Sequence, residues 1–281
     1  MIVVPEFPTK TFEDKRELFS SLKEHKHTLI AQKRATTKYA DSTFHYVSVL
    51  DDKGHATKAE SNNIADLDKL EVKLVINTTN LMDSHSDVHL KGIWKKSVKE
   101  NKNLLLLQEH QMTFDKIIST DIKASIDLMS WSDLGFKKLQ GTTEALVFTS
   151  IIEKSRNPFM FEQYAKGYVK EHSVGMRYVK VDLAVNSEES YYKEEKGIWD
   201  KYINEIANKE AAEELGYFWA VSEAKVIEGS AVVRGSNYAT PTLSVEQKDI
   251  EPLHSTQNDT EAENRTITSR GQKTMSIYKF N

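Results

Sequence analysis

The hydrophobic pattern of residues 156–180 changes from the spacing of a helix to the alternation of a strand. Asn157 is suited to cap a helix, and Pro158 is suited to a first helical position because it has no N–H to leave unpaired. From Val174 onward, apolar residues alternate with others, as they do in a strand. A helix followed by a strand is therefore predicted, with Ser173 where the strand begins.

Similar patterns elsewhere predict a mixed α+β protein. Strand-like alternation occurs in four other segments, which are 71–78, 116–126, 141–152 and 218–233. Helical spacing occurs in three, which are 11–37, 92–99 and 188–215, with Gly216 as the stop of the last. Residues 104–107 are all leucine, which is typical of a strand buried on both faces, and His110 follows soon after.

These patterns divide the chain into three parts. Residues 1–69 are expected to form an N-terminal arm with a charged helix and a polar linker. Residues 70–243 are expected to form one folded domain, and residues 244–281 a polar, disordered tail. The lysines and arginines of the arm are interpreted as a solvated helix face, with docking to a larger assembly as the alternative.

The composition excludes several classes of function. The chain has 281 residues, of which 39% are hydrophobic and 28% charged, and a net charge of −4 that gives no reason to expect nucleic-acid binding. The absence of cysteine excludes disulfides, thiolate catalysis and cysteine-based zinc sites. No apolar run approaches the ~20 residues of a membrane span, and the first residues carry no signal-peptide pattern. We therefore expect a protein of a cytosol-like compartment without a membrane partner.

Ser173 and His110 form the first candidate constellation. A serine hydroxyl is a weak nucleophile and needs a neighbouring base, most often an imidazole, to accept its proton. His110 follows a buried apolar run, which is a rigid place from which to direct a base. Spacing alone leaves open that Ser173 belongs to an ordinary Ser-x-Gly turn and that His110 is structural.

The segment 83–89 (DSHSDVH) is the second candidate. Alternate positions of an extended chain project to one face, so His85, Asp87 and His89 could converge on a metal, and His110 could complete the set. The competing interpretation is a polar turn in which Asp87 bonds to the local backbone.

Glu228 and Arg234, in the segment 228–237 (EGSAVVRGSN), are the third candidate. A carboxylate in a strand could orient a histidine, and an arginine before a glycine could bind an anionic group. Both residues could equally be charges at a sheet edge. The chain contains no phosphate loop and no dinucleotide-binding fingerprint.

The order of these segments resembles the tailed-phage prohead maturation proteases, serine proteases that are related to herpesvirus assemblin. The resemblance covers residues 70 to about 245. It rests on four segments in the family's order: DSHSDVHLKGIWKKSV, LLLLQEH, KEHSVGMRY and IEGSAVVRGSNYATP.

The resemblance implies an assemblin-like β-barrel surrounded by helices and a reaction without cofactor or metal. The family's catalytic histidine matches His110, its nucleophile matches Ser173, and its acidic residue matches Glu228. Herpesvirus relatives use a second histidine as the third member. His172 is a poor candidate for that role, because it adjoins the nucleophile and would point to the opposite face of the strand.

The implied function is that of a serine endopeptidase of bacteriophage capsid maturation. Its substrates would be segments of the major capsid protein and of the scaffold, together with the protease itself. It would act in the host cytoplasm, inside the assembling prohead during virion assembly. The herpesvirus relatives are activated by dimerisation, so the resemblance leaves open whether this chain forms a homodimer.

The chain departs from the family at two places, where Ser86 precedes Asp-Val in place of glycine and Ile93-Trp94 replaces a small residue and phenylalanine. These changes concern local packing more than chemistry. Two alternatives to the protease remain: a metal-dependent hydrolase that uses the ligand set of the second constellation, and a non-catalytic capsid assembly or scaffold protein.

Overall fold

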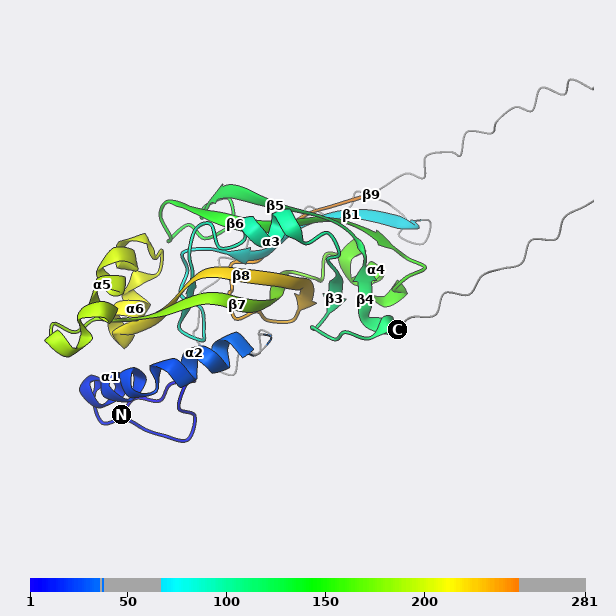
Figure 1. The fold of residues 1–281 in the computed structure, drawn as a ribbon. Helices are drawn as coiled ribbons and strands as arrows, with labels where there is room; N and C mark the ends of the chain where they lie inside the picture. Colours follow the sequence, from blue (N-terminus) through cyan, green and yellow to red (C-terminus); the bar gives the residue numbers. More distant parts are fainter. Residues whose placement is uncertain (36, 38–66, 248–281) are drawn as a thin grey trace, which may run out of the picture. The chain divides into compact units, whose positions relative to one another are not determined.

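The computed structural model describes residues 1–35, 37 and 67–247 of the chain (Figure 1). Helices and strands are mixed along this part, which confirms the predicted α+β class. Most of the predicted polar linker and of the predicted disordered tail lies outside the described residues. Residues 1–35 belong to the same compact unit as the strands. None of the described helices has the length and apolar character needed to cross a bilayer.

The first sheet is antiparallel and contains four strands. Its order is β5 (Asp121–Ser130), β6 (Thr142–Glu153), β1 (Lys69–Thr78) and β9 (Thr242–Gln247). The predicted strands 71–78 and 141–152 are thus β1 and β6. The predicted strand 116–126 divides into β4 (Ile117–Ser119), which belongs to the other sheet, and β5.

The second sheet is built around one long strand, β8 (Tyr217–Val232). On one side β8 pairs in antiparallel fashion with β7 (Glu171–Val185), which is nearly as long. On the other side it pairs in parallel with two short strands, β2 (Asp87–His89) near its beginning and β3 (Leu106–Gln108) near its end. Strand β4 then pairs with β3.

Neither sheet closes into a barrel in the described part of the chain, which corrects the expectation of a closed barrel. A closed barrel requires a hydrogen-bonded ladder that continues around the whole sheet. Between β7 and the segment leading into β9, the structure has only the isolated bridge of Glu171 with Pro241. The two sheets therefore remain separate.

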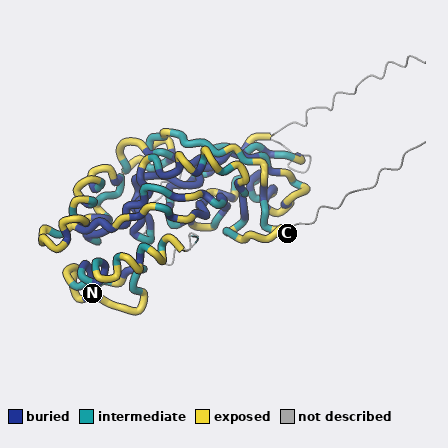
Figure 2. Tube along the Cα trace, in the orientation of Figure 1, coloured by how far each residue is buried: buried dark blue, intermediate teal, exposed yellow. Residues whose placement is uncertain are grey.

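The main core contains apolar side chains from both sheets and from helix α4 (Pro158–Ala165). In Figure 2, buried positions are concentrated in most of the strands, although β5 has none, and exposed positions are frequent in both helices and connections. Residues of this core include Val72, Leu74, Ile76, Leu106, Leu146, Phe148, Phe161, Tyr164, Val174 and Met176. Strands β7 and β8 pack one face against this core, and near Ala184 and Phe218 their other face packs against a second apolar cluster.

The charged helix predicted over residues 11–37 is two helices, α1 (Lys15–Glu24) and α2 (Lys26–Ala35). Asp14 caps α1 by accepting a hydrogen bond from the N–H of Glu17 at 2.9 Å. The helix ends at His25, whose ring Nδ1 lies 2.9 Å from the carbonyl oxygen of Ser21. This side-chain contact with the last turn accompanies the break that the hydrophobic spacing did not reveal.

The helix and strand predicted at residues 156–180 are α4 (Pro158–Ala165) and β7. Asn157 caps α4, as predicted, by accepting a hydrogen bond from the N–H of Met160 at 3.1 Å. The short helix predicted over residues 92–99 is α3 (Lys95–Glu100), and a 3₁₀ turn, η2 (Phe114–Lys116), precedes β4.

The helix predicted over residues 188–215 is interrupted. It consists of η3 (Ser190–Tyr192), α5 (Lys193–Tyr202), η4 (Ile203–Glu205) and α6 (Lys209–Leu215). Contacts with the chain near residue 81 account for the break: the N–H of Ala207 donates to Asn80, and the side chain of Asn208 bonds to both backbone groups of Met82. The stop at Gly216 is confirmed, with a left-handed φ of 82°.

Candidate active site

His110 lies in a strained turn that follows β3. Glu109 and His110 both have a left-handed backbone, with φ values of 50° and 58°, which costs non-glycine residues about 1–3 kcal/mol each. Two hydrogen bonds to β8 hold the turn: the N–H of Glu109 donates to the carbonyl of Ala231 at 2.9 Å, and the N–H of His110 donates to Oγ of Ser230 at 3.1 Å. Such strain is concentrated at functional sites.

The side chain of His110 is bonded to the carboxylate of Glu228. Nδ1 of His110 lies 2.6 Å from Oε1 of Glu228, and the two side chains are 6% and 0% exposed. Because a carboxylate accepts hydrogen bonds, Nδ1 carries the proton and Nε2 carries the lone pair. The second oxygen of the carboxylate, Oε2, accepts a hydrogen bond from Oγ of Ser230 at 2.6 Å. The imidazole is thus held in the tautomer that a general base requires.

The register of β7 with β8 places Ser173 on the same face as this pair. Ser173 lies opposite Ser230, and Gly175 lies opposite Glu228. Residues directly opposite each other in an antiparallel pair point to one face of the sheet, as do residues two positions apart on one strand. Ser173, Glu228 and Ser230 therefore share a face.

Gly175 allows the carboxylate of Glu228 to lie directly against strand β7. A Cβ built on Gly175 would overlap Oε1 of Glu228 and would lie 2.7 Å from its Cδ. The carboxylate thus lies directly over β7 at Gly175, and Nδ1 of His110 is bonded to that same oxygen. His110 is therefore bonded to a carboxylate on the face of the sheet that also bears Ser173. Ser173 itself is 6% exposed.

Replacing Gly175 with alanine should reduce the free energy of unfolding by about 1–3 kcal/mol, as overpacking of a filled site does. The new methyl group must displace a carboxylate that is fully buried and bonded on both oxygens. Gly197→Ala is the control, since a Cβ there meets nothing within 4 Å in helix α5 and should stabilise the helix by up to about 1 kcal/mol. Urea unfolding of both variants measures the difference, and equal stability of the two would contradict the close approach.

His172 points to the opposite face from Ser173, as predicted. Its Nδ1 lies 3.1 Å from the carbonyl oxygen of Thr240 and therefore donates to it, and its Nε2 accepts from the hydroxyl of Tyr164 at 3.0 Å. Burial lowers the pKa of His172 to about 4, which keeps the ring neutral at pH 7. His172 is a core histidine in this fold.

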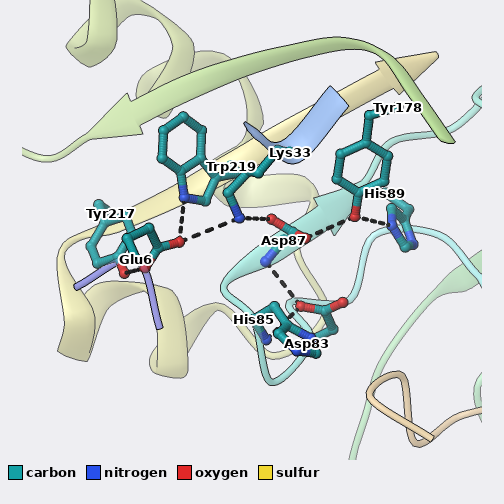
Figure 3. A network of polar contacts seen from close by, with 9 residues as sticks. All are labelled: Glu6, Lys33, Asp83, His85, Asp87, His89, Tyr178, Tyr217 and Trp219. Atoms are coloured by element: carbon teal, nitrogen blue, oxygen red, sulfur yellow. Dashed lines mark hydrogen bonds and ion pairs between the residues drawn. The ribbon is translucent and has the colours of Figure 1, made fainter. Parts of the chain in front are cut away.

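The predicted metal ligands do not converge (Figure 3). Asp87 and His89 share a face of β2, as expected, and both contact the hydroxyl of Tyr178, at 2.8 and 3.0 Å. Ser86 has a left-handed φ of 58°, which ends the alternation before it reaches His85. His110 is at the other end of β8, bonded to Glu228. Among the described residues, no three histidine or acidic side chains are grouped so as to hold a metal ion.

Asp87 instead forms a buried ion pair that the sequence did not indicate. Nζ of Lys33, from α2, lies 2.7 Å from Asp87 and 3.3 Å from Glu6 (Figure 3). Glu6 also accepts hydrogen bonds from Trp219 at 2.7 Å and Tyr217 at 2.8 Å, at the beginning of β8. Burial by itself lowers the pKa of Lys33, but the two carboxylates outweigh it and hold that pKa above its ordinary value. We call these five residues the ion-pair network.

A groove of about 380 Å³ is lined by the end of β8 and by Glu109, the residue before His110. Its polar border includes Glu109, next to His110, and Glu171, which lies opposite Val232 and two residues from Ser173. Its apolar lining comes from α4, from the segment leading into β7 and from the end of β8; these residues are Phe159, Met160, Tyr168, Val169, Val232 and Val233. Phe159, Tyr168 and Val233 are 58%, 64% and 87% exposed. Exposed apolar side chains that converge on one hollow are typical of a surface that binds a partner.

The structure thus bonds His110 to Glu228 and places Ser173 on their face of the sheet, whereas Arg234 is exposed beyond the end of β8. Sequence reasoning assigned no role to Ser230 and gave Gly175 a general one. The spacing of Glu228 and Ser230 carried a usable signal, because residues two apart on a strand share a face. No sequence signal identified the contact of Gly175 with the carboxylate.

Comparison of the chain with protein-family models, with curated proteins and with solved structures found no match.

Proposed function

We propose that the protein is a serine endopeptidase of phage capsid maturation, with Ser173 as the nucleophile, His110 as the general base and Glu228 as the residue that orients it. The observation that carries this proposal is the hydrogen bond of 2.6 Å between His110 and Glu228, on the strand face that also bears Ser173. An acid, an imidazole and a hydroxyl arranged in this order are what serine hydrolysis requires. The finer assignment of the fold as assemblin-like belongs to the same proposal.

The reaction has two stages. Oγ of Ser173 attacks the carbonyl carbon of the peptide bond while its proton passes to Nε2 of His110, and Glu228 stabilises the imidazolium that forms. Backbone N–H groups close to Ser173 or to Arg234 would hold the oxyanion. His110 then protonates the leaving nitrogen as the C–N bond breaks, which leaves an acyl ester on Ser173. Water attacks the ester in the second stage, with its proton passing through His110 to Oγ, and the carboxylic acid is released.

The groove supports a polypeptide as the substrate. An extended chain advances about 3.3 Å per residue, and the groove begins two residues along β7 from Ser173. A peptide with its carbonyl at Ser173 could therefore place a large apolar side chain among Phe159, Tyr168 and Val233. The motifs of the sequence add the class of substrate: segments of the capsid protein and of the scaffold, cleaved inside the prohead in the host cytoplasm.

A fluorophosphonate probe, which reacts with activated serines, tests the proposal without knowledge of the cleavage site. Intact-mass and peptide mass spectrometry of the wild-type protein should show one adduct, on Ser173, and Ser173→Ala should show none. Ser150→Ala is the matched control, since Ser150 is also a buried strand serine but its hydroxyl has no hydrogen-bond partner. This variant should react as the wild type does. A folded wild-type protein that does not react would contradict the proposal and favour a non-catalytic assembly protein.

A further inference from the structure

We infer that Ser230 is a positioning residue of the proposed site, which fixes both the carboxylate of Glu228 and the turn that carries His110. This inference rests on the proposed function and adds a residue to it. Ser230 is fully buried in β8, with an exposed fraction of 0%. The hydroxyl of Ser230 contacts both the side chain of Glu228 and the backbone N–H of His110.

The contacts form a closed ring of three hydrogen bonds. Oγ of Ser230 lies 2.6 Å from Oε2 of Glu228, Oε1 of Glu228 lies 2.6 Å from Nδ1 of His110, and the N–H of His110 lies 3.1 Å from Oγ of Ser230. A backbone N–H only donates, and a carboxylate accepts. The hydroxyl must therefore accept from His110 and donate to Glu228, so the direction of each bond in the ring is determined.

The ring of hydrogen bonds restricts two movements in the site, namely rotation of the carboxylate of Glu228 and relaxation of the backbone at His110. A carboxylate bonded through one oxygen can rotate about its last bond, and the bond from Ser230 to Oε2 keeps Oε1 directed at the imidazole. The left-handed backbone of His110 is unfavourable by itself, with a φ of 58°, and Oγ of Ser230 offers its N–H a fixed acceptor. A site held to within about 0.5 Å of its working geometry needs this kind of support.

The strand geometry makes the position of Ser230 specific. Ser230 is two residues from Glu228, so the two side chains share a face, and it lies opposite Ser173 on β7. On its other side it lies opposite Leu107 of β3, close to the turn that follows this strand. Ser230 is therefore the residue of β8 that adjoins the proposed nucleophile on one side and the base on the other.

Three variants of Ser230 separate the effect of the hydroxyl from that of the shape of the side chain. Ser230→Thr keeps a hydroxyl. Ser230→Val introduces a side chain of nearly the same shape as threonine but without a hydroxyl. Ser230→Val should react with the fluorophosphonate probe about 10- to 100-fold more slowly than the wild type, whereas Ser230→Thr should keep most of the rate. Ser230→Ala, which adds no atoms, should be as slow as Ser230→Val. The matched control is Ser150→Val, where the buried hydroxyl that is lost has no partner.

A second measurement does not depend on reactivity. The Nδ1–H proton of His110 gives an NMR signal that can be assigned by its loss in His110→Ala. We expect the signal in the wild type and in Ser230→Thr, and a shifted or absent signal in folded Ser230→Ala and Ser230→Val. A role in stability alone would lower the melting temperature without changing this signal.

The possible failures are distinguishable. Valine and threonine variants with equal labelling rates and equal His110 signals would overturn the role of Ser230 and leave the protease proposal intact. A wild-type protein that does not label would overturn the protease proposal. The His110 signal would in that case still decide whether Ser230 holds the pair.

Discussion

Replacing His110 with alanine should reduce processing of a co-expressed capsid protein by about 10⁴- to 10⁶-fold, and replacing Ser173 with alanine should do the same. In the proposed mechanism the hydroxyl of Ser173 attacks only when a base removes its proton, so neither residue is effective without the other. The double variant should therefore be no less active than either single variant, because residues that act as a unit are not additive. Quantitative mass spectrometry of the processed and unprocessed capsid protein measures all three rates.

His27→Ala is the matched control for this experiment, because His27 is an exposed histidine of α2. It should process the capsid protein at the wild-type rate. A chelator should leave processing unchanged, whereas a metal-dependent hydrolase would lose its activity. Normal processing by folded His110→Ala would exclude the proposed mechanism.

Lys33→Met should lower the free energy of unfolding by about 3 kcal/mol or more, which is the usual cost of leaving a buried charge without its partner. The variant keeps most of the volume of the lysine stem and removes its charge. Asp87 is 0% exposed and would lose its cation, and Glu6, whose side chain is 3% exposed, would lose the same one. Urea denaturation with a linear extrapolation measures the change.

Two further variants identify the cause of that loss. Lys69→Met removes a lysine whose ion pair with Glu153 is at the surface, with side chains 41% and 48% exposed, and should change stability by less than about 1 kcal/mol. Adding Asp87→Asn to Lys33→Met should recover part of the stability, because it removes the unpaired charge. If Lys33→Met and Lys69→Met are equally stable, the ion-pair network contributes little to the fold.

Elements with local signals were predicted well from the sequence. Helix α4 has both a capping asparagine and a proline at its start, and the change to alternation marked β7. The segments 11–37 and 188–215 were each predicted as one helix, and each is broken. The second break depends on Asn208 and its bonds to Met82, residues far apart in the chain. Hydrophobic spacing contains no information about such contacts.

In the candidate site, too, features with a local sequence signal could be predicted, and features that depend on contacts between distant residues could not. A motif could select Ser173, His110 and Glu228, because residue type and order were sufficient for that choice. The ion pair of Lys33 could not be selected, since Lys33 is one of several lysines in a charged helix and its burial results from packing against β2 and β8. The barrel was expected from the resemblance alone, and it is not closed in the described residues because only the isolated bridge of Glu171 with Pro241 links β7 to the segment before β9.

Strand β8 is long enough to carry contacts at both of its ends that depend on the same register. Trp219, near the beginning, bonds to Glu6, and Glu228, near the end, bonds to His110. Sliding a strand by a single residue turns every side chain to the opposite face. Such a slip would withdraw the indole from the first cluster and the carboxylate from the second in one step. The ion-pair network and the His110–Glu228 pair therefore both favour the same alignment of β8. A slip of the strand would break the contacts at both of its ends.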